Sequence, residues 1–251
     1  MKKGDGQQVL QSLCISEKAF SDLTQVQDFL DIISLFNVKG FYIIIDRENA
    51  DNPNIINDTI LTNIMYFMYN LSYINEFEII LGFGDFIGIP IYCTGINTIS
   101  TGWFNTLRRF SSTDLIPRDG GRRANRRYFS NKILNSLLIV PEINEISNNR
   151  KLNRILSNSK YDSVMYNDLS GSQWSDSINC LHNWYSMNSL LNEIDKKISI
   201  EKKVEYMLNL ISNAKSIYTD LNEEFWDIKS KSNHLNTWDE ALRNFLAMIK
   251  E

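Results

Sequence analysis

The sequence predicts an α/β fold, with a parallel sheet in the first part of the chain and a helical domain after it. Short apolar runs, bounded by glycine and polar residues, alternate with segments of helical period as far as Ser130. Such an alternation of strand and helix indicates a parallel sheet, because right-handed crossovers return each strand in the same direction. Beyond Ser130 the apolar residues recur at helical spacing.

Five strands are predicted in this first part. The clearest is FYIII at Phe41–Ile45, a β-rich apolar run between Gly40 and the polar DREN, which is typical of a strand buried on both faces. Apolar residues spaced three and four apart predict helices over residues 22–36 and 58–72, between these strands. The five predicted strands are residues 8–16, 41–45, 78–81, 89–93 and 97–101.

The second part of the chain is predicted to be mainly helical. Ser130 is placed to cap a helix that carries Leu134 and Leu138 on its apolar face. Residues 146–187 have the polar composition of loops. Residues 188–221 predict a long helix with one apolar stripe.

A last helix is predicted to begin at Thr237, where Glu240 completes a capping box. About five strands fit before the helical part, whereas a closed eight-stranded TIM barrel takes ~250 residues. The sheet is therefore either a small open sheet or part of a TIM-like barrel whose other strands have been lost or come from another chain. We predict a partial or divergent barrel-like α/β domain over residues 1–145 and a helical domain over residues 146–251. In the barrel case, a partner chain or a homo-oligomer would complete the fold.

Composition indicates an ordinary globular protein. Of its 251 residues, 43% are hydrophobic and 22% are charged, with a net charge of −4. Apolar runs stay far below the roughly 20 residues that span a bilayer, and the first residues contain no apolar core of signal-peptide length. We therefore predict a cytoplasmic protein without membrane contact. The three cysteines lie far apart without zinc spacing, so reduced thiols and no metal site are expected, and no particular cofactor is indicated.

The most specific signal is a block of arginines. Seven of the eleven arginines lie within twenty residues and face only two aspartates, which gives the segment a net charge of +5. Guanidinium groups bind phosphate through two hydrogen bonds, and interleaved aromatic residues such as Trp103 and Tyr128 stack on bases. The block therefore predicts nucleic-acid or nucleotide-phosphate binding; the alternative is pairing with acidic residues of the same chain or of a partner subunit. The arginines are Arg108, Arg109, Arg118, Arg122, Arg123, Arg126 and Arg127.

Candidate catalytic carboxylates follow two of the predicted strands. Asp46 and Glu48 follow the strand at 41–45, and Asp85 follows the strand at 78–81. Functional groups of parallel α/β folds sit at these carboxyl ends, where a carboxylate can act as a general base or as a substrate anchor. Asp46 and Asp85 have a second interpretation as caps of a loop and of a helix.

The histidine content argues against one class of mechanism. The chain contains only two histidines, His182 and His234, and both lie in the predicted helical part, away from the strand ends. A Ser-His-Asp mechanism requires a histidine beside its nucleophile. The sequence therefore does not indicate a hydrolase of that kind.

Two segments resemble the last two βα units of the tRNA-guanine transglycosylase barrel. They read ILGFGD at Ile80–Asp85, a strand that ends in a G-x-G turn, and GINTISTGWFNTLRR at Gly95–Arg109, which leads into an arginine-bearing segment. The resemblance implies a barrel-like fold and nucleic-acid binding. Ser100 stands where that family carries its nucleophilic aspartate, and its cysteine-rich zinc site has no counterpart, so base exchange is not implied.

Two functions are therefore predicted as alternatives. In the first, the protein binds nucleic acid or a nucleotide phosphate through the arginine block and acts on it with the carboxylates at the strand ends, by transglycosylase-like or hydrolytic chemistry. In the second, it is a non-catalytic interaction subunit of a larger assembly, and the arginine block docks a partner protein. The sequence leaves open whether the protein is an enzyme.

Overall fold

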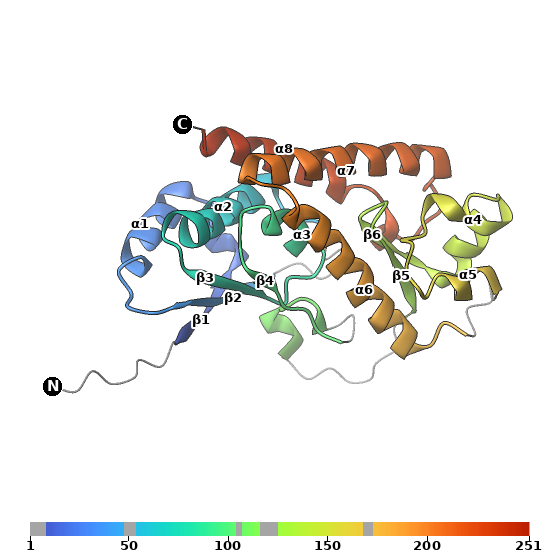
Figure 1. Ribbon diagram of the computed structural model, residues 1–251, viewed down its shortest axis with the longest axis horizontal. Coiled ribbons are helices and arrows are strands. Elements are labelled where there is room, and N and C mark those ends of the chain that lie inside the picture. Colours follow the sequence, from blue (N-terminus) through green and yellow to red (C-terminus); the bar gives the residue numbers. More distant parts are fainter. Residues whose placement is uncertain (1–8, 48–53, 104–106, 116–124, 168–172, 251) are drawn as a thin grey trace.

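The computed structural model describes residues 9–47, 54–103, 107–115, 125–167 and 173–250. Its centre is a parallel sheet of four strands in the order β1-β2-β3-β4, and a separate antiparallel hairpin is formed by β5 and β6 (Figure 1). The strands are β1 Leu10–Ser16, β2 Gly40–Asp46, β3 Glu78–Gly82, β4 Thr98–Ile99, β5 Arg127–Ser130 and β6 Asn135–Leu138. The predicted α/β class with a parallel sheet is confirmed.

Helices surround the sheet and the hairpin. The α-helices are α1 Leu23–Ile33, α2 Asp58–Tyr69, α3 Gly88–Tyr92, α4 Asn144–Asn148, α5 Ser163–Asn167, α6 Asp176–Asp195, α7 Ile200–Leu221 and α8 His234–Met248. Shorter 3-10 or π turns are η1 Glu17–Phe20, η2 Asn70–Ile74, η4 Ser112–Leu115, η5 Ile139–Ile143, η6 Leu152–Arg154 and η7 Ile228–Ser230. In Figure 1, α6 runs diagonally between the parallel sheet and the hairpin, and α7 and α8 extend along the top. No helix in the described ranges has both the length and the apolarity needed to cross a bilayer.

The parallel sheet has one covered face and one partly open face. Phe41, Ile43 and Ile79 point into the main core and are fully buried. On the opposite face, Ser12 and Cys14 of the edge strand β1 are exposed. The described strands therefore form an open sheet, and no closed barrel is present among them.

Short polar side chains set the starts of α1 and α2. The carboxylate of Asp22 accepts a hydrogen bond of 2.9 Å from the backbone N–H of Thr24 at the start of α1. The side-chain oxygen of Asn57 does the same for Ile60, at 3.1 Å, at the start of α2. These caps satisfy N–H groups that the first helical turn leaves without a partner. The two helices predicted between the first three strands are thereby confirmed.

The prediction of a strand at residues 89–93 is wrong, because this segment forms helix α3. Every residue of α3 is buried. Periodicity cannot distinguish a short helix that is buried all round from a buried strand. Gly88 lies against Ile99, and a Cβ at Gly88 would come within 3.1 Å of that side chain. The close approach lets α3 pack directly on β4, which confirms the strand predicted around residues 97–101.

The prediction of a helix from Ser130 is also wrong. Residues 127–130 and 135–138 pair as an antiparallel hairpin, with Tyr128 opposite Leu137. Both strands are almost entirely buried, so their apolar residues do not alternate with polar ones as in a half-exposed strand. Some of these apolar residues fall at helical spacing, which led to the prediction of a helix. Leu134 has a φ of 55° in the connecting turn. This left-handed conformation is incompatible with a helix interior.

Helix α6 begins inside the segment predicted to be loop-like. Its buried face carries polar residues, among them Asn179, His182, Asn183 and Ser186, so no apolar stripe marks it in the sequence. The last helix begins at His234 rather than at Thr237, without a side-chain cap, so the predicted capping box does not form. The long helix predicted over 188–221 is the end of α6 followed by α7.

A single hydrophobic core contains residues from both parts of the chain. The rings of Tyr69 in α2 and Phe245 in α8 meet edge to face with centroids 5.7 Å apart. Thr62 in α2 donates to the backbone oxygen of Ala241 in α8 at 3.4 Å. The boundary predicted between residues 145 and 146 falls within α4. The division into two domains stays a prediction.

Candidate functional site at the carboxyl edge of the sheet

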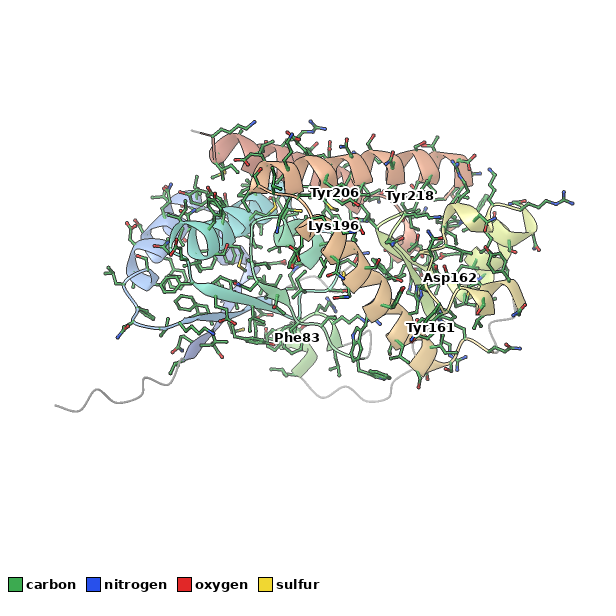
Figure 2. The ribbon with its side chains drawn as sticks, viewed as in Figure 1. Phe83, Tyr161, Asp162, Lys196, Tyr206 and Tyr218 are labelled. Carbon is green, nitrogen blue, oxygen red and sulfur yellow. The ribbon has the colours of Figure 1, made fainter. Side chains whose placement is uncertain are left out.

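The segment after β4 returns to the carboxyl end of β2. Phe110 forms a parallel bridge with Asp46, and the backbone N–H of Arg47 donates to the oxygen of Phe110 at 3.0 Å. The backbone N–H of Ser112 donates to the Asp46 carboxylate at 2.8 Å. The ring of Phe83, labelled in Figure 2 just after β3, lies 5.7 Å from that of Phe110. These contacts hold the two arginines that precede Phe110 at this edge.

Asp85 occupies the end of β3 among three arginines. It is 8% exposed and has a φ of 40°, a left-handed conformation that aspartate tolerates better than most residues. Burial raises the pKa of its carboxyl group, while the charges of Arg108, Arg47 and Arg109 and the backbone N–H of Phe86 act in the opposite direction. The carboxyl group thus takes up a proton more readily than an exposed aspartate does.

Arg47 is an internal anchor of this edge. It is 3% exposed, its Nε forms an ion pair of 2.5 Å with Glu17, and its Nη2 donates to the oxygen of Ile55 at 2.9 Å. Burial lowers the pKa of the guanidinium, and the charges of Glu17 and Asp85 raise it in part. The ion pair joins the segments that follow β1 and β2.

Arg108 lies at the same edge but has no ion pair of this kind among the described residues, and its guanidinium interacts with the thiol of Cys180. It is 5% exposed, and its Nε and Nη2 atoms have no hydrogen-bond partner within the described residues. Burial lowers the pKa of its guanidinium, and Asp85 and the thiol of Cys180 raise it in part. Buried charged donors without partners carry a large desolvation penalty. The guanidinium therefore keeps two buried nitrogens whose hydrogen-bonding capacity is unsatisfied within the described residues.

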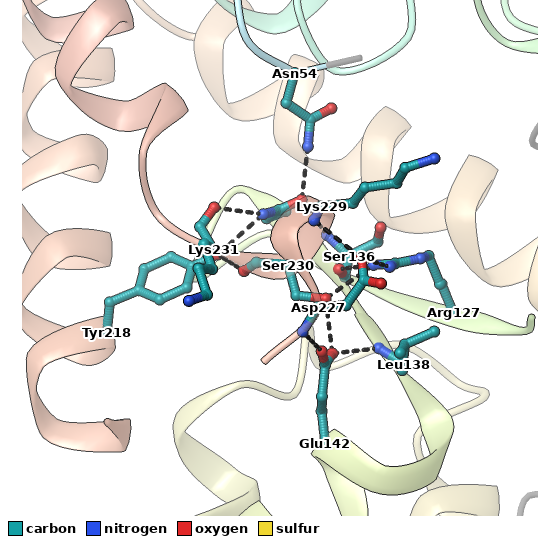
Figure 3. A network of polar contacts seen from close by, with 11 residues as sticks. Asn54, Arg127, Ser136, Leu138, Glu142, Tyr218, Asp227, Lys229, Ser230 and Lys231 are labelled. Atoms are coloured by element: carbon teal, nitrogen blue, oxygen red, sulfur yellow. Dashed lines mark hydrogen bonds and ion pairs between the residues drawn. The ribbon is translucent and has the colours of Figure 1, made fainter. Parts of the chain in front are cut away.

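The other described arginines of the block are used inside the protein. Arg126 pairs with Asp176 at 3.0 Å. Figure 3 shows Arg127 in a polar network in which it donates to Ser136, Ser230 and Asp227 at 2.9, 2.9 and 2.6 Å. For these two arginines the structure agrees with the alternative prediction, in which arginines of the block pair with acidic residues of the same chain. Arg118, Arg122, Arg123 and Glu48 lie outside the described residues.

The two predicted aromatic contacts differ in their surroundings. Tyr128 is fully buried, stacks on His182 with centroids 4.2 Å apart, and donates to Asp162 at 2.9 Å. Its predicted role in stacking on a base does not fit this structure, because no face of the ring is accessible. Trp103 is half-buried and meets Trp184 of α6 edge to face, with centroids 5.0 Å apart.

A serine, a histidine and an aspartate meet in the second part of the chain, but not as a catalytic triad. Ser159 lies 2.8 Å from Nδ1 of His182 and donates to Asp162 at 2.7 Å (Figure 2 labels Asp162). In a triad the aspartate orients the ring nitrogen opposite the serine. Here that nitrogen, Nε2, lies 2.7 Å from the backbone oxygen of Phe129 instead. All three side chains are buried, so the cluster stabilises the packing of α6 on the hairpin.

Helix α6 contributes to the candidate site, which the sequence did not indicate. The Sγ of Cys180 donates to the backbone oxygen of Trp103 at 2.8 Å, and its thiol lies beside the Arg108 guanidinium. The charge of Arg108 also acts on His182, whose pKa burial lowers to about 4. No sequence signal connects residues this far apart. The site thus combines strand ends with a helix from the second part of the chain.

Within the described ranges, no three His, Cys, Asp or Glu side chains gather as metal ligands. Comparison of the chain with protein-family models, with curated proteins and with solved structures gives no match. The geometry of the carboxyl edge is therefore the feature that indicates a function. That geometry offers buried cationic donors beside one carboxyl group of raised pKa.

Proposed function

We propose that this protein binds the phosphate group of a nucleotide or nucleic acid at the carboxyl edge of its parallel sheet. The observation that carries the proposal is Arg108, a buried guanidinium whose Nε and Nη2 have no hydrogen-bond partner among the described residues. The planar guanidinium matches two oxygens of a phosphate, and a bound anion would offset the desolvation of the buried charge. Phosphate is thus the ligand chemistry that this environment favours.

The burial of Arg108 favours a nucleotide over a long nucleic-acid strand. A guanidinium that is 5% exposed is reached by a group that enters the site, not by a backbone that runs along a surface. Arg126 and Arg127, which would extend a surface track, bind Asp176 and Asp227 instead. Of the carboxylates predicted for acid–base chemistry, Asp85 has the raised pKa that such a role uses.

The strand order also supports the proposed kinship with TIM-like barrels. Each strand of the sheet neighbours the next one in sequence, as in a barrel, and the charged side chains lie at the carboxyl ends. The resemblance to the transglycosylase barrel remains part of this proposal.

The test compares wild type with Arg108→Met. Methionine fills much of the same volume without a charge, so the fold is expected to be retained, because two buried nitrogens without hydrogen-bond partners among the described residues are removed. Titration calorimetry with inorganic phosphate and with AMP is expected to show at least a tenfold loss of affinity in the variant, or about 1.4 kcal/mol. Arg243→Met is the matched control, since Arg243 pairs with Asp239 on the exposed surface of α8.

The proposal fails if Arg108→Met binds both ligands as wild type does. It also fails if wild type binds neither phosphate nor AMP nor a single-stranded oligonucleotide. An oligonucleotide that binds far more tightly than AMP, with affinity falling steeply as salt rises, would show nucleic acid as the ligand. In that case Arg122→Ala combined with Arg123→Ala is expected to weaken binding at every sequence.

A second candidate function is an interaction subunit, favoured by the open face of the sheet. Ser12 and Cys14 of the edge strand are exposed there, and Tyr42 and Ile44 of β2 are only partly covered. A partner chain that packs on this face would cover these side chains. Native mass spectrometry of the purified protein distinguishes the two cases, since a bound nucleotide and a partner chain differ in mass. A monomer without a partner would contradict the second function.

A further inference from the structure

Asn183 of α6 is a buried amide without hydrogen bonds. It is 2% exposed, and neither its Oδ1 nor its Nδ2 has a partner in the part of the chain that the structure describes. A neighbouring buried asparagine is satisfied, because Asn179 accepts a hydrogen bond from Trp174 at 3.3 Å. An unpaired amide of this kind is costly to bury. A group other than the described residues is therefore expected to pair with it.

Asn183 lies on the part of α6 that borders Arg108. Each residue advances about 100° round an α-helix, so Asn183 lies about 60° from Cys180 and, on its other side, about 100° from His182. The guanidinium of Arg108 acts on both Cys180 and His182. Asn183 thus lies on the helix face between Cys180, which interacts with the Arg108 guanidinium, and His182, on which the charge of Arg108 acts.

Two further contacts bring the segment after β4 against this part of α6. Cys180 donates to the backbone oxygen of Trp103, and Trp103 packs on Trp184, the residue after Asn183. Thr101, two residues before Trp103, has a buried hydroxyl that also lacks a partner among the described residues. Unsatisfied groups of three kinds therefore belong to this segment and to the part of α6 that it contacts: a cationic donor, a hydroxyl and a neutral amide.

We propose that Asn183 binds the edge of a nucleobase whose phosphate is held by Arg108. An amide presents one acceptor and two donors side by side, which matches a base edge that offers a donor next to an acceptor. The ligand class is then a nucleoside monophosphate, and Asn183 determines specificity for the base while Thr101 faces the sugar or the base. This inference rests on the proposed function, because it takes the phosphate subsite of Arg108 as given.

The first test uses the wild-type protein with ligands that differ only in the base. Calorimetry with AMP, GMP, CMP, UMP and ribose 5-phosphate is expected to show that at least one nucleotide binds about tenfold more tightly than ribose 5-phosphate, the gain typical of paired hydrogen bonds to a base. Equal affinity for ribose 5-phosphate and all four nucleotides would overturn the inference, and would leave phosphate binding by Arg108 intact.

The second test replaces the amide. Asn183→Leu keeps a similar volume and removes both polar atoms, so the preferred nucleotide is expected to lose about tenfold in affinity while the affinity for ribose 5-phosphate stays unchanged. Asn192→Leu is the matched control, because Asn192 is exposed on the same helix. A variant at position 183 that keeps wild-type base preference contradicts the assignment. Loss of binding to ribose 5-phosphate as well would show a structural role instead.

Discussion

Asp46 and Ser112 are joined by a hydrogen bond of 2.8 Å across 66 residues of sequence. The bond runs from the backbone N–H of Ser112 to the carboxylate at the end of β2, beside the bridge between Asp46 and Phe110. Together these contacts fix the segment that carries Arg108. Asp46 is therefore a positioning residue for the candidate site.

Replacement of Asp46 tests this positioning role. Asp46→Ala removes the acceptor and is expected to weaken phosphate binding about fivefold, because the segment with Arg108 loses a charge-assisted hydrogen bond of about 1 kcal/mol. Asp46→Asn retains an acceptor oxygen and is expected to bind phosphate at least as well as wild type. Calorimetry with inorganic phosphate checks both. A simple charge effect would instead make the alanine variant bind more tightly, and that result would contradict the role.

The buried carboxyl group of Asp85 is expected to oppose anion binding. Burial raises its pKa, so folding disfavours the ionised form. The stability that the carboxyl group contributes is present below pH 3.8 and is lost as pH rises through the raised pKa. Asp85→Asn is expected to retain wild-type stability or gain some near neutral pH and to bind phosphate about tenfold more tightly. Thermal melting and phosphate titration measure the two effects. Weaker binding by the variant would mean that the carboxyl group itself holds the ligand.

Arg127 is expected to matter for stability and not for binding. In the network of Figure 3 its guanidinium holds Asp227 and Ser230, while the buried carboxylate of Glu142 accepts from Leu138 and Ser230 at 2.6 and 2.7 Å. Arg127→Leu is expected to lower the free energy of unfolding by about 2 kcal/mol, because Ser136, Ser230 and Asp227 lose a charged donor. Urea denaturation measures this loss, and phosphate affinity at low temperature is expected to stay at the wild-type value. A large loss of affinity in a folded variant would place Arg127 in the ligand site.

The protein is expected to lose stability as pH falls from 6.5 towards 4. Burial lowers the pKa of both His182 and His234 from 6.5 to about 4, so the unfolded chain binds more protons in this interval. Each imidazole then contributes a slope of up to about 1.4 kcal/mol per pH unit, and stability present above pH 6.5 is lost as pH falls. Urea denaturation at several pH values is expected to show a smaller slope in His182→Gln than in wild type. An unchanged slope would contradict the burial of His182 as a neutral ring.

The sheet could be predicted because its strands carry a local signal. Phe41–Ile45 is apolar throughout and follows Gly40. In the structure this run is a strand, as its local pattern predicts. The same signal gave a wrong prediction at Ile89–Cys93, because a short helix that is buried all round also has an apolar sequence. The hairpin around Leu134 was missed because a left-handed residue other than glycine is not visible in a sequence pattern.

The candidate site could be predicted only in part. Asp85 was predicted from its place after a strand, a rule that depends on chain order, and Arg108 was predicted as part of the arginine block. Asn183 could not be predicted as a site residue. Its candidacy depends on being a buried amide without a partner among the described residues, which its neighbours in sequence do not reveal. Tyr128 was assigned to a base by composition alone, whereas the hairpin turns its ring into the core.

The packing of α8 on α2 has a consequence for synthesis of the protein. Thr62 and Ala241, which meet at this contact, are 179 residues apart. While the ribosome is still producing the chain, the face of α2 that α8 covers stays open to solvent or to chaperones. Contacts of such sequence separation form slowly, and exposed apolar surface invites aggregation in the meantime. We therefore expect the yield of correctly folded protein to depend on the rate of translation and on chaperone capacity more than on the final free energy of unfolding.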